Sequence, residues 1–329
     1  MSKSRAWPGI KETVLFRPSS QITGKTMIHL YRWAITSTLC TSIGLMSLSA
    51  EAASLGVSSE VTSDGANKAS QPVTVPARSD ELRICAAKNQ APLSIEDGSG
   101  LENKIGVVLA ESMKRNPKFV WSDKPAIYLV RDFLDKKLCD VIVGLDTGDA
   151  RVSTSKPYYR AGYVFISRQD RNLEINSWND ERIRKLGHIV VAFGSPGEVM
   201  LKDIGKYEDN MAYLYSLVNF KSARNQYSQI EPSKMVAEIS NGSADLAVGF
   251  APDVARYVKS SAVPLRMTVI NDNAVRTSGD KVPQHYDQSV GVRKDDTALL
   301  TEIDAALKIA KPKINEILRE ESVPTLDEK

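Results

Sequence analysis

The sequence predicts an α/β protein of two lobes, each a mostly parallel sheet flanked by helices. An apolar, β-branched run at 141–143 is typical of a strand buried inside such a sheet. Similar runs alternate with helical patterns through short connections, which favours parallel strands. The alternation restarts after Arg168, and a late strand at 289–293 returns the chain. We therefore expect lobe 1 at 80–163 and 290–329 and lobe 2 at 164–289, with crossing strands near Tyr163 and Val290.

The period of the apolar residues indicates the elements of lobe 1. Between 101 and 114 they recur every three or four residues, as they do on one face of a helix. The loops that follow the strands are polar, and open α/β sheets bind ligands at that edge. The last helix contains Pro312, where we expect an interruption. The expected strands are 82–87, 119–121 and 141–143, and the expected helices are 101–114, 126–137 and 299–318.

Lobe 2 shows the same alternation. Its segment ADLAVG at 244–249 resembles CDVIVG at 139–144, and each follows an amphipathic helix, so we expect one such unit per lobe. A polar loop at 271–284 precedes the returning strand. The expected strands are 163–167, 188–193, 217–220, 245–250 and 265–270, and the expected helices are 178–186, 198–204, 232–241 and 252–259.

Residues 1–52 have the character of a signal region. An apolar run at 33–50 follows Arg32 and ends in Ala50-Glu51-Ala52, as in a secretory signal peptide. A membrane anchor is the alternative, although the run is at the short end for a spanning helix. Met27 would start a more compact signal. Residues 53–79 are rich in Ser, Ala and Thr and indicate a flexible leader. Because the signal peptide directs secretion, we expect a periplasmic protein without stable membrane insertion after signal removal.

The composition excludes several function classes. The chain has 329 residues, 42% of them apolar and 25% charged, which is enough for two globular domains. Without residues 1–52, 37 basic and 38 acidic residues remain, so no basic footprint for nucleic acid is present. Neither G-x-S-x-G nor H-E-x-x-H occurs, and the histidines lie far apart. We expect no enzyme activity, no metal site and no cofactor.

The order of elements around CDVIVGLDTGDARVSTSKPYYRAGYVFISR at 139–168 resembles the type II periplasmic solute-binding proteins. A strand, a polar loop, Pro157-Tyr158-Tyr159 and a second strand follow one another, as where that family's first lobe crosses into the second. Four longer stretches resemble the MxaJ/MoxJ family, relatives of solute-binding proteins associated with a quinoprotein dehydrogenase of methanol oxidation. They lie at 83–105, 121–168, 193–227 and 244–265.

The resemblance implies how the cysteines and several surface residues are used. In that fold the strands of Cys85 and Cys139 are neighbours, which allows a disulfide; two buried free thiols are the alternative. The cleft residues that it implies are Asn89, Gln90, Pro92, Trp121, Asp146, Arg151 and Tyr158. We add Gly194 and Ser195, because a Gly/Ser turn before a helix presents free backbone N–H groups to an anion or polar group. Arg151 would pair a ligand carboxylate, or would pair with Asp146 or Asp149 instead.

The segment 207–227 departs from ordinary solute-binding proteins because it is rich in tyrosine, asparagine and basic residues. Such a composition favours protein contact, with a locally packed insertion as the alternative. The expected partner-surface residues are Tyr207, Tyr213, Tyr215, Arg224 and Tyr227.

The resemblance implies an accessory protein that assists assembly, maturation or activation of PQQ methanol dehydrogenase by direct contact with it or its assembly intermediate. The alternative is a receptor that delivers a small polar ligand to an ABC-type transporter. The two differ in a feature that a structure can display. A receptor needs a cleft with convergent polar groups, whereas an accessory protein needs an exposed contact surface.

Overall fold

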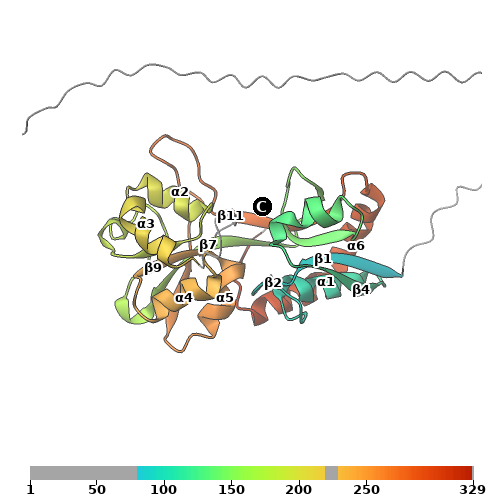
Figure 1. Cartoon of the computed structure of the whole chain (residues 1–329), viewed down its shortest axis with the longest axis horizontal. Helices are drawn as coiled ribbons and strands as arrows, with labels where there is room; N and C mark the ends of the chain where they lie inside the picture. Colours follow the sequence, from blue (N-terminus) through green and yellow to red (C-terminus); the bar gives the residue numbers. More distant parts are fainter. Residues whose placement is uncertain (1–79, 219–228, 328–329) are drawn as a thin grey trace, which may run out of the picture. The chain divides into compact units, whose positions relative to one another are not determined.

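The structure is a computed structural model that describes residues 80–218 and 229–327 (Figure 1). The expected signal region at 1–52, the leader at 53–79, and Arg224 and Tyr227 lie outside the described residues.

The N-terminal half begins with three parallel strands. β1 (Glu81–Ala87) lies between β4 (Asn116–Ser122) and β5 (Val141–Asp146). α1 (Leu101–Ser112) connects β1 to β4 and buries Ile105 and Leu109 against the sheet. A short hairpin of β2 (Asn89–Gln90) and β3 (Ser94–Ile95) precedes α1. The parallel arrangement predicted for this half is therefore present.

The other half is built around two parallel strands, β8 (Ile189–Val191) and β9 (Leu246–Phe250). Both strands are buried because helices pack beside them. These elements occupy the yellow and orange part of Figure 1. Its helices are α2 (Pro196–Asp203), α3 (Tyr207–Ser216), α4 (Pro232–Ser240) and α5 (Ala251–Lys259), and β10 (Leu265–Val269) completes the strands.

Two long antiparallel strands run between the halves (Figure 1). β7 (Tyr159–Arg168) pairs with β11 (His285–Val292) through residues 159–162 and with β9 through residues 163–166. The strand order β4-β1-β5-β11-β7-β9-β8 is therefore one continuous hydrogen-bonded path. Each half has its own set of paired strands, and β7 joins the two sets because it pairs with β11 in one half and with β9 in the other. The predicted α/β fold, with a sheet in each half and strands that cross between them, is confirmed. The lobe boundaries at 163/164 and 289/290 stay a prediction.

The short β6 (Ser153–Thr154) pairs with β11, and β12 (Thr325–Leu326) pairs with β7.

Two large hydrophobic cores lie along this path. One is formed by β8, β9 and helices α2 to α5, and the other by β1, β5, α1 and α6 (Thr297–Glu320). α5 belongs to both, because Val254 is buried in the first core and Ala255 in the second. A smaller third cluster surrounds Cys85 and Cys139. Burial of these side chains supplies most of the driving force for folding.

Several predicted elements need correction. Residues 126–137 form a 3-10 turn (Ala126–Tyr128) and a π-helix (Val130–Leu134) instead of an α-helix. The wider turn brings Leu129, Val130 and Leu134 together into the third cluster. Residues 178–186 contain only a 3-10 turn (Ile183–Lys185), because the segment buries too few side chains to support a helix.

Two further predictions fail near α3 and α6. Leu217 and Val218 follow α3 in a turn, so the strand expected at 217–220 is not formed by its described residues. α6 is not interrupted at Pro312. Pro312 is exposed, and Ala310 and Ile314 on either side of it are buried in the second core, so packing outweighs the missing hydrogen bond.

Candidate functional site

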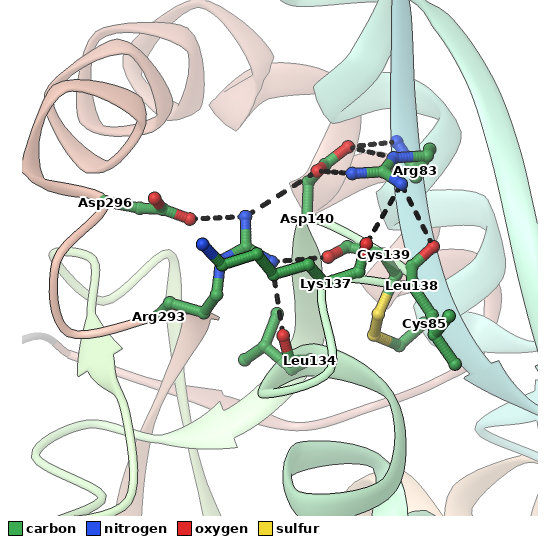
Figure 2. Close-up of a disulfide and its surroundings, with 9 residues drawn as sticks. All are labelled: Arg83, Cys85, Leu134, Lys137, Leu138, Cys139, Asp140, Arg293 and Asp296. Atoms are coloured by element: carbon green, nitrogen blue, oxygen red, sulfur yellow. Dashed lines mark hydrogen bonds and ion pairs between the residues drawn. A yellow bond between two sulfur atoms is a disulfide. The ribbon is translucent and has the colours of Figure 1, made fainter. Parts of the chain in front are cut away.

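The predicted disulfide is present between Cys85 on β1 and Cys139, just before β5 (Figure 2). The two Cα atoms are 5.5 Å apart, within the range that a disulfide tolerates. β1 and β5 are adjacent parallel strands, which puts the two cysteines side by side. Both side chains are buried, so the bridge has a structural role.

Two arginines surround the bridge and satisfy the carbonyl groups of the turn that leads to Cys139 (Figure 2). The Arg83 guanidinium donates to both carboxylate oxygens of Asp140, at 2.6 and 3.0 Å, and also to the carbonyls of Lys137 and Leu138. Arg293 donates to the Cys139 carbonyl at 2.6 Å. These contacts fix the start of β5. The polar end of β5 and the loop after it carry two of the predicted cleft residues, Asp146 and Arg151.

A cavity of about 610 Å³ lies where the β2–β3 hairpin faces the turn between β8 and α2. Of the nine predicted cleft residues, four line it: Asn89, Gln90, Gly194 and Ser195. The hairpin and the turn follow β1 and β8, as the rule for the carboxyl ends of strands predicts. The wall also contains Tyr163, Phe193 and Phe250.

The Gly194-Ser195 turn has less binding capacity than the sequence indicates. The Gly194 N–H donates to the Glu198 carboxylate at 2.6 Å, and the Ser195 hydroxyl accepts from the Glu198 N–H at 3.2 Å. The Ser195 hydroxyl also donates to the Ala192 carbonyl. The N-terminus of α2 is therefore capped by its own residues. The expectation of free N–H groups for an anion is wrong for these donors.

The other five predicted residues do not line this cavity. Pro92 lies in the turn of the β2–β3 hairpin, where its carbonyl accepts from the N–H of Leu101. Trp121 stacks on Phe119 along β4, with ring centroids 5.1 Å apart. Asp146 accepts a hydrogen bond from Gln288 at 2.6 Å. Tyr158 is 2% exposed and packs in the second core.

Arg151 pairs with Asp149, one of the two structural partners considered for it. Its Nη2 and Nε atoms donate to the Asp149 carboxylate at 2.6 and 3.0 Å, and Nη1 donates to the Ile127 carbonyl. The hydrogen bonds from Arg151 hold the pKa of Asp149 below its usual range. The guanidinium that would hold a ligand carboxylate is thus engaged within its own loop.

Two carboxyl groups that were not among the predicted cleft residues lie close together here, Asp253 in the cavity wall and Glu102 at the start of α1. Burial raises the pKa of Asp253 to about 7. Burial and the nearby Asp253 raise the pKa of Glu102 to about 8. A Cβ atom at Gly144 would come within 2.0 Å of the Glu102 carboxylate, so glycine is required there. Asp253 follows the strand predicted at 245–250, and the strand-end rule applied there would have found it.

The predicted partner surface is only partly exposed. Tyr207 is 8% exposed, and Tyr213 stacks on His188 and donates its hydroxyl proton to Glu238 at 2.6 Å. Tyr215 is 56% exposed. Tyr207 and Tyr213 therefore pack α3 onto the protein, and Tyr215 is the accessible member among the described residues.

Metal sites and membrane spans are two further features that the described residues would display. Residues 80–218 and 229–327 contain no group of three or more His, Cys, Asp or Glu side chains arranged to hold a metal ion. No helix within these ranges is long and apolar enough to cross a bilayer.

Comparison with solved structures and curated proteins identifies the class of protein. No family model matches the chain. The periplasmic binding protein XoxJ from Methylobacterium extorquens AM1 shares the fold, with a TM-score of 0.55 at 22% identity over 75% of this chain and 100% of that one. The crystal structure of MxaJ from Methlophaga aminisulfidivorans has a TM-score of 0.72 at 46% identity, over 74% of this chain and 100% of that one. The fold is that of the periplasmic binding proteins.

Sequence similarity then gives the family. Protein MoxJ of Methylorubrum extorquens is 61% identical over 245 residues, which are 74% of this chain and 81% of the relative. Protein MoxJ of Paracoccus denitrificans is 46% identical over 264 residues, 80% of this chain and 96% of the relative. The chain belongs to the MoxJ/MxaJ family, and the resemblance stated from the sequence is confirmed.

Proposed function

We propose that this chain is a non-enzymatic periplasmic accessory protein of methanol oxidation. It assists assembly, maturation or activation of PQQ methanol dehydrogenase through direct contact with the enzyme or its assembly intermediate. The observation that carries this proposal is its 61% identity to a MoxJ protein over 81% of that relative's length. A second candidate is a receptor for a small polar ligand, which the cavity of about 610 Å³ favours.

The contacts of Arg151 argue against an amino acid receptor. Its guanidinium is engaged by Asp149 and does not line the cavity. The N-terminus of α2 is capped by Ser195 and Glu198. A charge-assisted contact to a carboxylate contributes roughly 1.5–3 kcal/mol. Without it, the described residues of the cavity wall provide no unengaged basic group to hold the carboxylate of an amino acid.

A charged cluster that joins α5 to α1 and to the end of α6 also argues against a receptor that opens and closes. The Glu321 carboxylate accepts from Arg256 at 2.6 and 2.8 Å and from Lys104 at 2.7 Å. Arg256 further donates to the Ser99 carbonyl at 2.9 Å. We call these three residues, Lys104, Arg256 and Glu321, the Glu321 cluster. A change in the angle between α5 and α1 would have to break or rearrange these contacts.

Two apolar side chains on α3 offer a contact surface. Met211 is 39% exposed and Tyr215 is 56% exposed, and residues four apart lie on the same side of a helix. Tyrosine and methionine are enriched at protein interfaces, so we assign the contact with the dehydrogenase to this pair. We call it the α3 surface.

A pull-down tests the assignment. The tagged chain is used to recover the dehydrogenase from the periplasm of methanol-grown cells. Substitution of both Met211→Ser and Tyr215→Ser should reduce recovery at least about tenfold, since central interface side chains often contribute more than 1 kcal/mol each. Ile309→Ser is the matched control, because Ile309 is an apolar residue of α6 that is 69% exposed.

Three outcomes would contradict parts of the proposal. Equal recovery with the double variant removes the α3 surface from the contact. No recovery with the unaltered chain removes the contact itself. Micromolar binding of an amino acid in calorimetry, together with no dehydrogenase recovered, establishes the receptor in its place.

A further inference from the structure

One end of the cavity combines aromatic rings with an acidic side chain. Tyr163 and Phe250 line the cavity with their ring centroids 5.5 Å apart, and Tyr286 contacts both rings, at 6.0 and 6.3 Å. Asp253 lies three residues after Phe250, in the first turn of α5, and lines the same cavity. Aromatic faces beside a carboxylate form an environment that attracts an organic cation.

Among the described residues of the cavity wall, acidic side chains outnumber basic ones. Lys124 is the basic residue of its wall, and its ammonium pairs with Asp132 at 2.7 Å. Asp123, also in the wall, pairs with Lys88 at 3.1 Å. Two acidic residues of the wall, the exposed Glu231 and Asp253, have no hydrogen-bond donor or cation in contact with their carboxylates among the described residues. A carboxylate in such surroundings lacks a positive partner.

The helix N-terminus does not account for Asp253. An acidic residue in a first turn interacts favourably with the helix dipole, which by itself would favour the charged form and lower its pKa. The pKa of Asp253 is raised instead, to about 7, because burial disfavours its charge. The position therefore carries an electrostatic cost that an incoming positive charge would remove.

We propose that this cavity binds a small organic cation, whose charge is met by Asp253 and whose apolar substituents contact Tyr163 and Phe250. Among the described wall residues such a site would meet an ammonium group and offer no unengaged partner to a carboxylate, so it agrees with the proposal that no amino acid binds. It does not depend on contact with the dehydrogenase, and it is tested on the purified chain alone.

The proposal predicts how affinity depends on pH. Below pH 7 Asp253 is mostly protonated, so a cation should bind more weakly and should displace a proton when it binds. With a pKa of about 7, the charged fraction falls roughly thirtyfold between pH 8.5 and pH 5.5, and affinity should follow. The ionisable groups that face Asp253 are Glu102 on α1, Tyr159 and Tyr163 on β7, and Tyr257 on α5, with Asp123, Lys124 and Glu231 in the cavity wall.

Calorimetry with tetramethylammonium chloride provides the test, because this cation keeps its charge at every pH. We expect binding at pH 8.5, weaker binding at pH 5.5, and heats that change with the ionisation enthalpy of the buffer near pH 7. Asp253→Asn should weaken binding at least about tenfold, as expected for loss of a charged contact. Asp295→Asn, the same change at an exposed position outside the cavity, should have no effect.

A second variant and a neutral probe keep the test decisive. Phe250→Leu retains an apolar side chain but removes the aromatic face, and should weaken binding several-fold. Neopentyl alcohol, which resembles the cation in shape but has no charge, should not bind. The proposal is overturned if tetramethylammonium does not bind at pH 8.5, if Asp253→Asn binds as well as the unaltered chain, or if the alcohol binds equally.

Discussion

Replacing Glu321 with glutamine should destabilise the protein at neutral pH, because Arg256 and Lys104 would lose their shared negative partner. The Glu321 side chain is 10% exposed, Arg256 27% and Lys104 37%, so the cluster is partly shielded from water. Removing one member of a fully buried pair costs about 3–5 kcal/mol, and exposure of the lysine reduces this. We expect a loss of about 2–3 kcal/mol.

Thermal unfolding at pH 7 measures the loss. A change of this size should lower Tm by about 4–10 °C in a protein of this length. Glu320→Gln is the control, because Glu320 is the adjacent residue, its side chain is exposed, and only its backbone carbonyl has a described partner, the ammonium of Lys259. Equal melting temperatures for the two variants would refute the reasoning.

The dependence on pH separates a charge effect from a packing effect. Burial acts to raise the pKa of Glu321, but hydrogen bonds from Arg256 and Lys104 leave it below its usual value. A carboxyl group with a lowered folded-state pKa stabilises the protein above its unfolded-state pKa, and this contribution is lost as pH falls through the folded-state pKa. The difference between Glu321→Gln and the unaltered chain should therefore be full at pH 7 and shrink below about pH 4.5. A difference that persists unchanged at pH 3 would point to packing.

Two further predictions concern stability and ligand binding. Replacing both Cys85 and Cys139 with alanine opens a link between residues 54 apart in sequence, and should cost up to about 4 kcal/mol by loop entropy, measured by urea unfolding; an unchanged midpoint would show that the bridge contributes nothing. Arg151→Gln should change stability by about 1 kcal/mol or less, since the side chain is 46% exposed. Cation binding measured by calorimetry should be unaltered, and a clear loss would place Arg151 at the site.

Periodic apolar segments were predictable from the sequence. α1, β5, β9 and α5 each bury side chains at the spacing that their residues display, and each was found within a few residues of its bounds. The π-helix at Val130–Leu134 was not predictable, because its apolar spacing fits an α-helix equally well and packing around the disulfide selects the wider turn. α3 was missed although Tyr207, Asn210 and Leu214 are its buried face, since its polar and aromatic residues were interpreted only as a surface.

The sequence predicted where the candidate site lies, but not which residues line it. Asn89, Gln90, Gly194 and Ser195 were expected in the cleft and line the cavity, and all four follow parallel strands, in agreement with the strand-end rule. The rule does not predict how far each loop extends, or which side chains within a loop pair with one another. Arg151 is engaged by Asp149 two residues away, and Trp121 stacks along the edge strand β4. Asp253 was overlooked because the strand-end rule was not applied to the strand predicted at 245–250.

The strand β7 limits how the length of this chain can vary. Eight of its ten residues, Tyr159 to Arg168, are buried, and they pair with β11 at one end and with β9 and β10 at the other. Side chains of a strand alternate between its two faces, so inserting or deleting one residue would reverse the faces of everything beyond it. Such a change within β7 would disturb both large cores at once. Differences in length between members of this family should therefore accumulate in loops such as 271–284, and hardly ever between residues 159 and 168.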